Sequence, residues 1–326
     1  MRLVATEEHF VIPPAPGTKP QGLPPLEPGS MVGAPWHLDH AASASMEIRL
    51  RTMDEHGVSV QLLSTPFGQA FPADVACEKV REINDFCASL VAQAPDRLAG
   101  LATIPTAVPE ACAPELEYCI KTLGFKGALV ANRVAGTKFL SEPEYDEFLT
   151  ALEDLEAPLY LHPGQPPQAI TDLCYSGCGL TDAQVSVFSR FGYGWHVDVG
   201  IHALHMMATG VFDRHPKLQV ILGHWGELLP YYVSRFDTAM PAECFGLERE
   251  IRDYLRENCY ATSSGIQDRD CMNFCKKVMG ADRLLYSAVY PFANFDGQDL
   301  LLTNPDFTPE EIELFAHGNA ERLFKL

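Results

Sequence analysis

Short apolar runs alternate with amphipathic stretches along the whole chain, and this alternation limits the folds open to it more than any other feature. Eight runs predict β-strands, at residues 3–6, 58–64, 98–104, 127–130, 158–161, 218–222, 259–262 and 283–286. Helical patterns lie between most of them, and several end at a glycine such as Gly57 or Gly124. Eight strands separated by helices are typical of an α/β protein with a (β/α)8 (TIM) barrel.

The chain length agrees with this fold, since 326 residues suit a single barrel domain over 1–326 with insertions. The longest excursion follows the fifth strand and contains a predicted helix at 197–209. A doubly wound sheet is the alternative. It would be expected to show a glycine-rich phosphate loop after an early strand, which this sequence lacks.

A proline-rich segment follows the first strand. Residues 13–45 hold Pro13, Pro14, Pro16, Pro20, Pro24, Pro25, Pro28 and Pro35. Such a segment forms neither regular helix nor central strand. In a barrel it would leave the carboxyl end of strand one and cover the mouth. We expect a lid or pocket wall that carries Met31, Trp36 and His37, with Trp36 as a candidate substrate contact. A surface excursion without a role is the alternative.

Composition excludes some classes of partner. The formal net charge of −19 argues against nucleic acid or an anionic membrane surface. No window approaches the roughly 18 apolar residues of a membrane helix. The first residues lack a basic stretch followed by an apolar run, so we expect a cytoplasmic protein. The ten cysteines are scattered and predict reduced thiols; the pairs Cys174/Cys178 and Cys271/Cys275 give little support for structural zinc.

Polar side chains follow the predicted strands at the barrel rim where catalytic groups gather. They are Glu7, His9, Ser64, Thr65, Asn132, His162, His224, Ser263, Ser264 and Ser287. Because strand residues alternate in direction, Glu7 and His9 should point to one side and Glu8 to the other. A carboxylate with histidines from several strand ends suits Zn²⁺ or Mn²⁺ that keeps one coordination position open for water or substrate. A hydrogen bond that only ties down the N-terminus is the alternative for Glu7 and His9.

Other side chains have both a functional and a structural interpretation. His162 and His224 could be ligands or catalytic groups, or core histidines bonded to the backbone. Glu227, three residues after His224, could orient it by a hydrogen bond. His196 is left open between an aromatic hinge and a pocket residue. Arg133 could neutralise an acidic substrate, as Asn132 beside it could bind one, or could be a surface charge.

Five motifs resemble the amidohydrolase-related decarboxylases. They are Glu7-Glu8-His9-Phe10, Leu159-Tyr160-Leu161-His162-Pro163, Gly210-Val211-Phe212-Asp213-Arg214-His215-Pro216, Ile221-Leu222-Gly223-His224-Trp225-Gly226-Glu227 and Asn319-Ala320-Glu321-Arg322-Leu323. The resemblance implies a TIM barrel, usually a homodimer or homotetramer. It also implies that Glu7, His9 and His162 match metal ligands, and that His224 with Glu227 matches an acid/base pair.

One segment departs from that family. The last strand of the family ends in Ser-x-Asp-[Tyr/Trp]-Pro-[Phe/Tyr], whose Asp binds the metal, whereas this chain has Ser287-Ala288-Val289-Tyr290-Pro291-Phe292. Valine neither ligates a metal nor carries a proton. Three outcomes stay open: a metal retained with His224 as proton carrier, a metal-free site that uses the histidines alone, or a non-catalytic relative. Tyr290 is a candidate substrate contact.

The expected activity is therefore that of a carbon–carbon lyase, a decarboxylase of a small aromatic or β-keto carboxylic acid. The expected cofactor is Zn²⁺ or Mn²⁺, or none. The alternatives are a metal-independent hydrolase, isomerase or cyclase on the same scaffold, or a protein without turnover.

Overall fold

The computed structural model describes residues 1–12, 45–65, 71–131, 133–293, 295 and 297–326. The predicted lid over 13–45, with Trp36, therefore lies outside the described residues except for Ser45, and Asn132 lies outside them as well.

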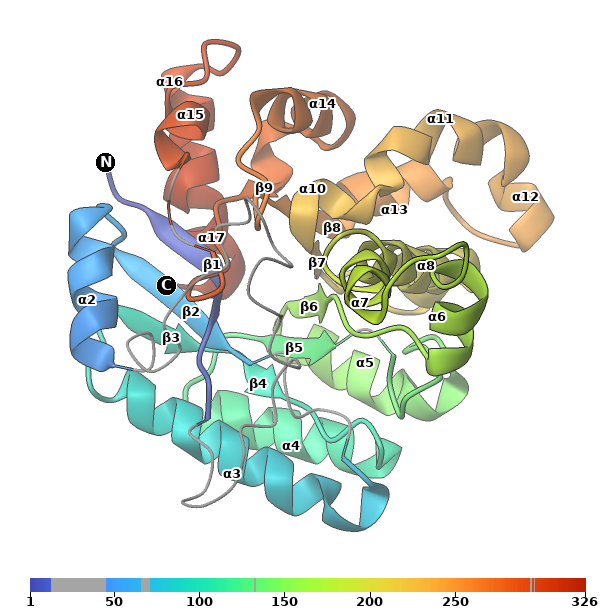
Figure 1. Ribbon diagram of the computed structural model, residues 1–326, viewed down its shortest axis with the longest axis horizontal. Coiled ribbons are helices and arrows are strands. Elements are labelled where there is room, and N and C mark those ends of the chain that lie inside the picture. Colours follow the sequence, from blue (N-terminus) through green and yellow to red (C-terminus); the bar gives the residue numbers. More distant parts are fainter. Residues whose placement is uncertain (13–44, 66–70, 132, 294, 296) are drawn as a thin grey trace.

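Short parallel strands form the centre of the molecule (Figure 1). They are β1 (Val4–His9), β2 (Val60–Ser64), β3 (Leu98–Gly100), β4 (Ala102–Thr103), β5 (Ala128–Ala131), β6 (Leu159–His162), β7 (Val220–Leu222), β8 (Cys259–Thr262) and β9 (Leu284–Leu285). Consecutive strands pair in parallel from β1 to β3 and from β4 to β9, with a shift of register in β1 between Ala5 and Glu8. The two short strands β3 and β4 follow one another directly and are interrupted at Leu101. The backbone N–H of Thr6 donates to the Tyr286 carbonyl at 3.1 Å, so the chain's first strand adjoins its last.

Helices surround the strands. They are α2 (Met46–Glu55), α3 (Ala73–Val91), α4 (Pro109–Lys121), α5 (Asp146–Asp154), α6 (Gln168–Cys174), α7 (Asp182–Ser189), α8 (Gly194–Ala208), α9 (Val211–Arg214), α10 (Gly223–Glu227), α11 (Leu229–Ala239), α12 (Ala242–Phe245), α13 (Ile251–Glu257), α14 (Arg269–Met279), α15 (Gln298–Leu302), α16 (Pro309–Glu313) and α17 (Asn319–Phe324). Short 3₁₀ turns η1 (Pro143–Tyr145) and η2 (Ala281–Arg283) and the π-helical turn η3 (Leu314–Gly318) complete the set. The predicted (β/α)8 barrel is confirmed.

The interior of the barrel is a packed core. It is built from alternate strand residues: Val4, Val60, Leu62, Ala99, Leu101, Leu129, Tyr160, Ile221, Tyr260 and Leu285. Leu323 and Phe324 of α17 close one end of this cluster. The residues that point the other way, such as Ala5, Leu63 and Leu161, pack against the surrounding helices in a second, larger core. A core inside the strands fixes where each strand ends, and so where the polar residues that follow it emerge.

Local sequence signals set several helix ends. Thr308 and Glu311 form a capping box at the start of α16, and Asp268 caps α14. Gly57 and Gly124 follow α2 and α4 with left-handed φ angles of +68° and +74°, as the helix-ending glycines predict.

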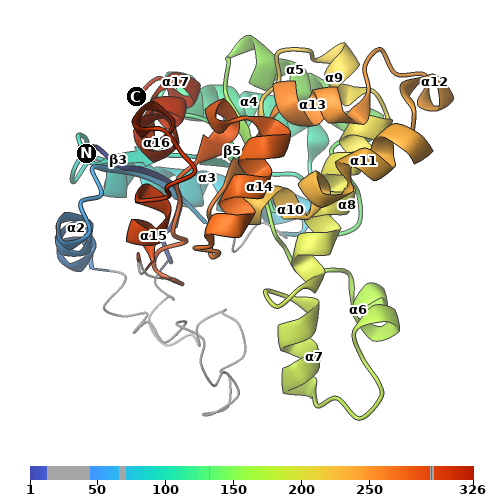
Figure 2. The ribbon, with the colours of Figure 1, turned by 90° about the horizontal axis from the view of Figure 1, so that it is seen from above.

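The excursion after β6, which is the fifth strand of the sequence prediction, forms an extended arm that contains α6 and α7. Figure 2 shows α6 and α7 projecting from the rest of the molecule, while α8 leads back to it. The sequence predicted the helix that became α8 but neither α6 nor α7. Within the described residues, none of the helices is both long and apolar enough to cross a bilayer.

Candidate active site

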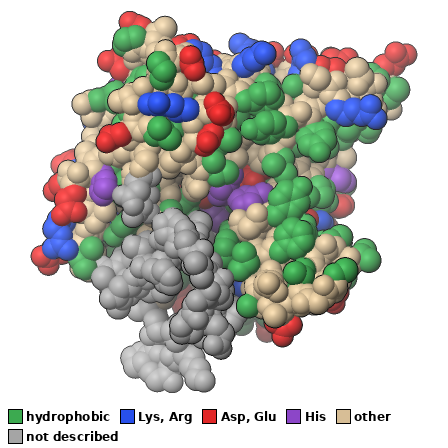
Figure 3. Space-filling view, turned by 45° about the horizontal axis from the view of Figure 1, so that its top comes forward, with side chains coloured by type: hydrophobic (Ala, Val, Ile, Leu, Met, Phe, Trp, Pro, Cys, Tyr) green, Lys and Arg blue, Asp and Glu red, His purple; other side chains and the backbone are tan. Residues whose placement is uncertain are grey.

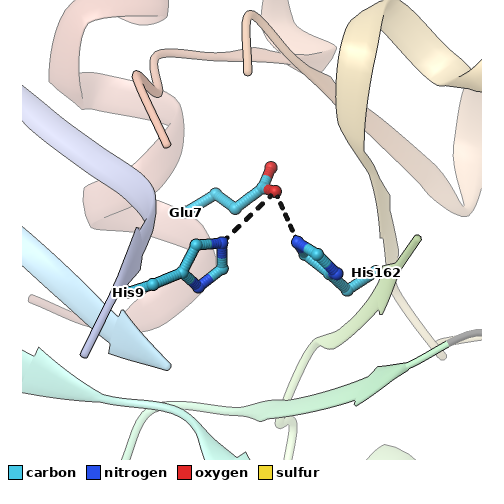
Figure 4. Close-up of side chains that lie close together, drawn as sticks. All are labelled: Glu7, His9 and His162. Atoms are coloured by element: carbon cyan, nitrogen blue, oxygen red, sulfur yellow. Dashed lines mark ion pairs between the residues drawn. The ribbon is translucent and has the colours of Figure 1, made fainter. Parts of the chain in front are cut away.

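Three predicted metal ligands come together at the carboxyl ends of β1 and β6. Glu7 and His9 point the same way from β1, and His162 ends β6 (Figure 4). His162 Nε2 lies 3.0 Å from Glu7 Oε1, and His9 Nε2 lies 3.8 Å from the same oxygen. All three side chains are buried. Alternation along the strand accounts for the pair from β1, since Glu8 faces the opposite way.

Each imidazole is held by its other nitrogen. His162 Nδ1 lies 2.7 Å from the Pro163 carbonyl, which can only accept, so Nδ1 carries a proton and Nε2 is the ring nitrogen turned toward Glu7. His9 Nδ1 lies 3.1 Å from Ser64 Oγ. Both Nε2 atoms therefore face Glu7, in the arrangement by which outer partners orient metal-binding histidines.

The second oxygen of Glu7 is fixed by hydroxyl groups. Tyr160 and Ser264 both donate short hydrogen bonds to Glu7 Oε2. Thr262 Oγ1 lies 3.1 Å from the Tyr160 hydroxyl and adds to this group. The sequence pattern placed Ser264 at the rim but did not identify Tyr160 as part of the site. The alternation of side chains along β6, which turns Tyr160 into the barrel, could have indicated it. The carboxylate is thus held on one oxygen and free on the other.

The donor atoms fit a divalent cation. Glu7 Oε1 and His9 Nε2 are buried and make no hydrogen bond within the described structure. Unpaired buried polar atoms are costly, and here they converge on one point. Burial opposes ionisation of Glu7, yet the imidazoles of His162 and His9 hold its pKa well below the ordinary value. Burial lowers the pKa of His9 to about 4. A charged carboxylate beside a neutral imidazole is the state a metal requires.

The segment after β9 lies directly against β1. The backbone N–H of His9 donates to the Tyr290 carbonyl at 2.6 Å, and that of Glu7 donates to Ser287 Oγ at 2.8 Å. Glu8 accepts the N–H groups of Ala288 at 2.9 Å and Tyr290 at 2.6 Å. These bonds fix Val289 beside the strand that carries Glu7 and His9.

Glu8 and Val289 both occupy unusual environments. Burial raises the pKa of Glu8 to about 8, against the opposing effect of its two backbone donors. Val289 is buried with φ +72°, a conformation that β-branched residues rarely adopt. Its side chain offers no ligand to a metal.

His224 and Glu227 form the second part of the site. His224 Nδ1 lies 2.8 Å from Glu227 Oε1, as the predicted orienting contact requires. Burial opposes ionisation of Glu227, but the charges of His224 and His196 lower its pKa to about 2. An imidazole held by a buried carboxylate through Nδ1 exchanges protons at Nε2.

A left-handed turn brings this pair together. His224, Trp225, Gly226, Glu227 and Leu228 all have positive φ angles, of 49°, 59°, 82°, 50° and 70°. Left-handed backbone costs a non-glycine residue roughly 1–2 kcal/mol. Tertiary contacts hold the turn: Trp225 is buried, its indole N–H donates to the Ile266 carbonyl at 2.8 Å, and Cys275 Sγ lies 3.2 Å from the Trp225 carbonyl.

Gly223 lies between the two parts of the site. A Cβ atom built on it would lie 3.1 Å from Glu227 Oε1, 3.3 Å from the Tyr160 hydroxyl and 3.4 Å from Glu7 Oε2. The carboxylate of the acid/base pair and that of the metal ligands therefore flank one glycine. A Cβ atom at this position would crowd Glu227 and the Tyr160 hydroxyl and would reach van der Waals contact with Glu7.

His196 also contacts Glu227. Its Nδ1 lies 2.9 Å from Glu227 Oε2, and its ring centroid is 4.2 Å from that of His224. His196, His224 and Glu227 form a second close group of metal-ligand atoms. In this group each contact has hydrogen-bond geometry, whereas the group around Glu7 has buried atoms without partners. Of the two groups, Glu7, His9 and His162 are therefore the candidate metal site.

Two of the predicted substrate contacts, Arg133 and Tyr290, have other partners in the structure. Arg133 forms an ion pair with Asp198, with Nη2 2.6 Å from Oδ1, and its Nη1 lies 3.3 Å from the Thr137 carbonyl. Its guanidinium also covers the Phe139 ring. Tyr290 is buried, stacks on Phe295 and lies under the Arg49 guanidinium.

The other predicted rim residues are structural. Ser263 Oγ donates to the Ser287 carbonyl at 2.8 Å, which joins the ends of β8 and β9. Ser64 orients His9, and Thr65 is buried beside it. Figure 3 shows histidine side chains near the middle of one face, with hydrophobic side chains beside them.

Known proteins resemble this chain over most of its length. The family model described as amidohydrolase matches residues 26–326. Gamma-resorcylate decarboxylase of Polaromonas sp. strain JS666 is 36% identical over 290 residues, covering 85% of this chain and 86% of that protein.

Solved structures are similar over the whole chain. A 2,6-dihydroxybenzoate decarboxylase in complex with 2,6-dihydroxybenzoate has a TM-score of 0.83 and 31% identity, covering 100% of this chain and 99% of the other. A dihydroxybenzoic acid decarboxylase from Polaromonas sp. JS666, with bound manganese and the inhibitor 2-nitroresorcinol, has a TM-score of 0.82 and 33% identity, covering 99% and 97%.

Proposed function

This chain belongs to the amidohydrolase family, and from that premise we propose that it is a carbon–carbon lyase that removes CO2 from a small aromatic carboxylic acid. The observation that carries the proposal is the position of Gly223, with Glu227 on one side and Glu7 on the other. An acid/base pair and a cation site then meet at one barrel rim. The similar decarboxylases named above support the reaction type.

The acid/base chemistry falls to His224. In the proposed reaction, its Nε2–H protonates the ring carbon that carries the carboxylate. The bond between that carbon and the carboxylate then breaks, its electron pair restores the aromatic ring, and CO2 leaves. The proton remains on the product. The His224 side chain is 11% exposed, so it can regain a proton from solvent before the next turnover.

Glu7, His9 and His162 would hold a divalent cation, Mn²⁺ or Zn²⁺. When bound, such a cation supplies positive charge that attracts an acidic substrate and stabilises developing negative charge. Manganese in the similar Polaromonas structure supports this choice. Glu7 keeps its free oxygen directed at the cation because Tyr160 and Ser264 hold the other oxygen.

The substrate class we assign is a benzoate with a hydroxyl group next to the carboxylate. The support is the bound 2,6-dihydroxybenzoate and 2-nitroresorcinol of the similar structures. The remaining assignments extend the same proposal: residues 1–326 form one barrel domain, the protein acts in the cytoplasm, and it assembles as a homodimer or homotetramer.

Direct assay tests the function. Protein purified without chelator is incubated with a panel of mono- and dihydroxybenzoates, CO2 release is measured, and metal content is determined on the same sample. We expect turnover of an ortho-hydroxybenzoate and a loss of roughly 10²-fold or more in His224→Ala at an unchanged unfolding temperature. Near-normal activity of His224→Ala would remove His224 from the mechanism. Metal-loaded protein without turnover on the whole panel would overturn the decarboxylase assignment.

A further inference from the structure

His196 lies in the first turn of α8, where the chain returns from the arm, and it contacts Glu227 and the His224 ring. It lies on α8, outside the strand-end residues that supply the rest of the site. We propose that His196 is a positioning residue that acts through Glu227: it holds Oε2 so that Oε1 keeps His224 in one tautomer. The inference rests on the proposed role of His224 and adds a residue that the sequence left unassigned.

The partners of His196 fix which nitrogen faces Glu227 as a donor. The Trp195 indole N–H lies 2.8 Å from His196 Nε2 and can only donate, so in the neutral ring Nε2 accepts and Nδ1 carries the proton. The Phe191 carbonyl lies 3.1 Å from the same Nε2 and can accept from it when the ring is charged. In both charge states Nδ1–H donates to Glu227 Oε2.

Glu227 is consequently held at both oxygens. Oε1 accepts from His224 and Oε2 from His196, at 2.8 and 2.9 Å. The carboxylate is buried, so an oxygen that lost its donor would have no water to replace it. Loss of His196 would leave Oε2 unpaired, and the carboxylate would turn to recover a bond. Turning moves Oε1 away from His224 Nδ1, and the imidazole then loses the partner that selects its tautomer.

Two substitutions separate this role from simple packing. His196→Leu keeps the approximate volume and removes both nitrogens, whereas His196→Asn keeps an amide N–H near the position of Nδ1 but has nothing at Nε2. If His196 only packs against Trp195 and Phe191, the two variants should behave alike. If it acts through Glu227, His196→Asn should retain function and His196→Leu should not.

The first measurement does not depend on turnover. Long-range ¹H–¹⁵N NMR of ¹⁵N-histidine-labelled protein reports the tautomer of each ring, and His224 is assigned by its loss in His224→Gln. We expect an Nδ1-protonated His224 in the wild type and in His196→Asn, and a mixture of tautomers in His196→Leu. An unchanged His224 signal in His196→Leu would overturn the inference, whether or not the protein proves to be a decarboxylase.

Kinetics gives the second measurement. We expect kcat of His196→Leu to fall roughly tenfold to hundredfold with KM changed less than about threefold, and His196→Asn to stay within about threefold of wild type. His205→Leu is the matched control: the same replacement on the same helix, at an exposed residue bonded to Ser141. A KM effect alone, or equal losses in the Leu and Asn variants, would contradict a positioning role. Absence of turnover in the wild type would instead reject the proposed function.

Discussion

At the scale of single residues, Glu7 shows how a site is prepared for a ligand before it arrives. One oxygen is held by Tyr160 and Ser264, and the other is buried without a hydrogen bond and faces the imidazoles of His162 and His9. The hydroxyl groups remove the freedom of the carboxylate to rotate, so less conformational entropy is lost when a cation binds. The affinity of the site therefore depends on residues that never touch the metal.

Tyr160→Phe tests this dependence. We expect Mn²⁺ affinity to fall roughly tenfold, because Glu7 Oε2 loses a donor and the carboxylate loses its fixed orientation. Isothermal titration of chelator-treated protein with Mn²⁺ gives the affinity. Tyr260→Phe, the same change at another tyrosine of the barrel interior, should bind as the wild type does. Equal affinity of the two variants would mean that the hydroxyl is not part of the metal site.

A substitution at Val289 would change both the backbone strain and the charge at this position. Aspartate and asparagine tolerate its φ of +72° better than valine does, and an aspartate would add an anionic ligand beside Glu7 and His9. We expect Val289→Asp to raise Mn²⁺ or Zn²⁺ affinity by roughly tenfold or more, measured as bound metal per chain. Val289→Asn relieves the same backbone strain without the charge. No gain in the Asp variant over the Asn variant would place residue 289 away from the metal.

At the scale of elements, the left-handed turn of α10 holds strained backbone at His224 and Glu227, the proposed acid/base pair. Gly226 has φ +82°, and a Cβ atom built there would lie 2.9 Å from Pro230 Cγ. The turn persists because Trp225 anchors it by burial and a hydrogen bond. An ordinary right-handed turn would direct His224 and Glu227 differently.

Gly226→Ala should therefore destabilise the protein by about 1–3 kcal/mol and disturb the acid/base pair. Gly246 is the matched control, since its φ is +68° and a Cβ there meets nothing within 4 Å. We expect Gly246→Ala to show only the smaller cost of the backbone conformation. Urea unfolding of the two variants measures the difference, and equal free energies of unfolding would show that the contact with Pro230 is tolerated.

At the scale of the whole molecule, the arm projects from the barrel (Figure 2). Several large apolar side chains on it are exposed, among them Leu173 at 81%, Phe188 at 41% and Tyr193 at 47%. Exposed apolar surface of this kind marks protein contacts. We therefore propose the arm as an interface of the proposed homo-oligomer.

Leu173→Lys should consequently lower the molar mass measured by light scattering after size exclusion, because a charge replaces apolar contact between subunits. Leu300→Lys is the control, an exposed leucine on α15 outside the arm. A monomeric wild type, or an identical mass shift in both variants, would reject the arm as the interface.

The sequence predicted the barrel well because each strand is a short apolar run between helices, and burial on both faces requires that pattern. It predicted Glu7, His9, His162 and His224 because strand ends in a barrel share one rim. It could not predict the left-handed turn, since Trp225 and Pro230 impose it through tertiary contacts. The sequence did not predict a role for His196 for a similar reason, because its hydrogen bond to Glu227 forms only when α8 packs against the barrel.

Hydrogen bonds between Thr6 and Tyr286 join residues 280 positions apart. Glu7 follows Thr6 directly, so the first carboxylate of the site along the chain depends on contacts that the last strands supply. Ser264 after β8 and Ser287 after β9 both contact Glu7, and its surroundings are complete only when both strands are in place. We therefore expect tight binding of a cation to require the carboxyl-terminal strands, and loss of these strands to abolish it.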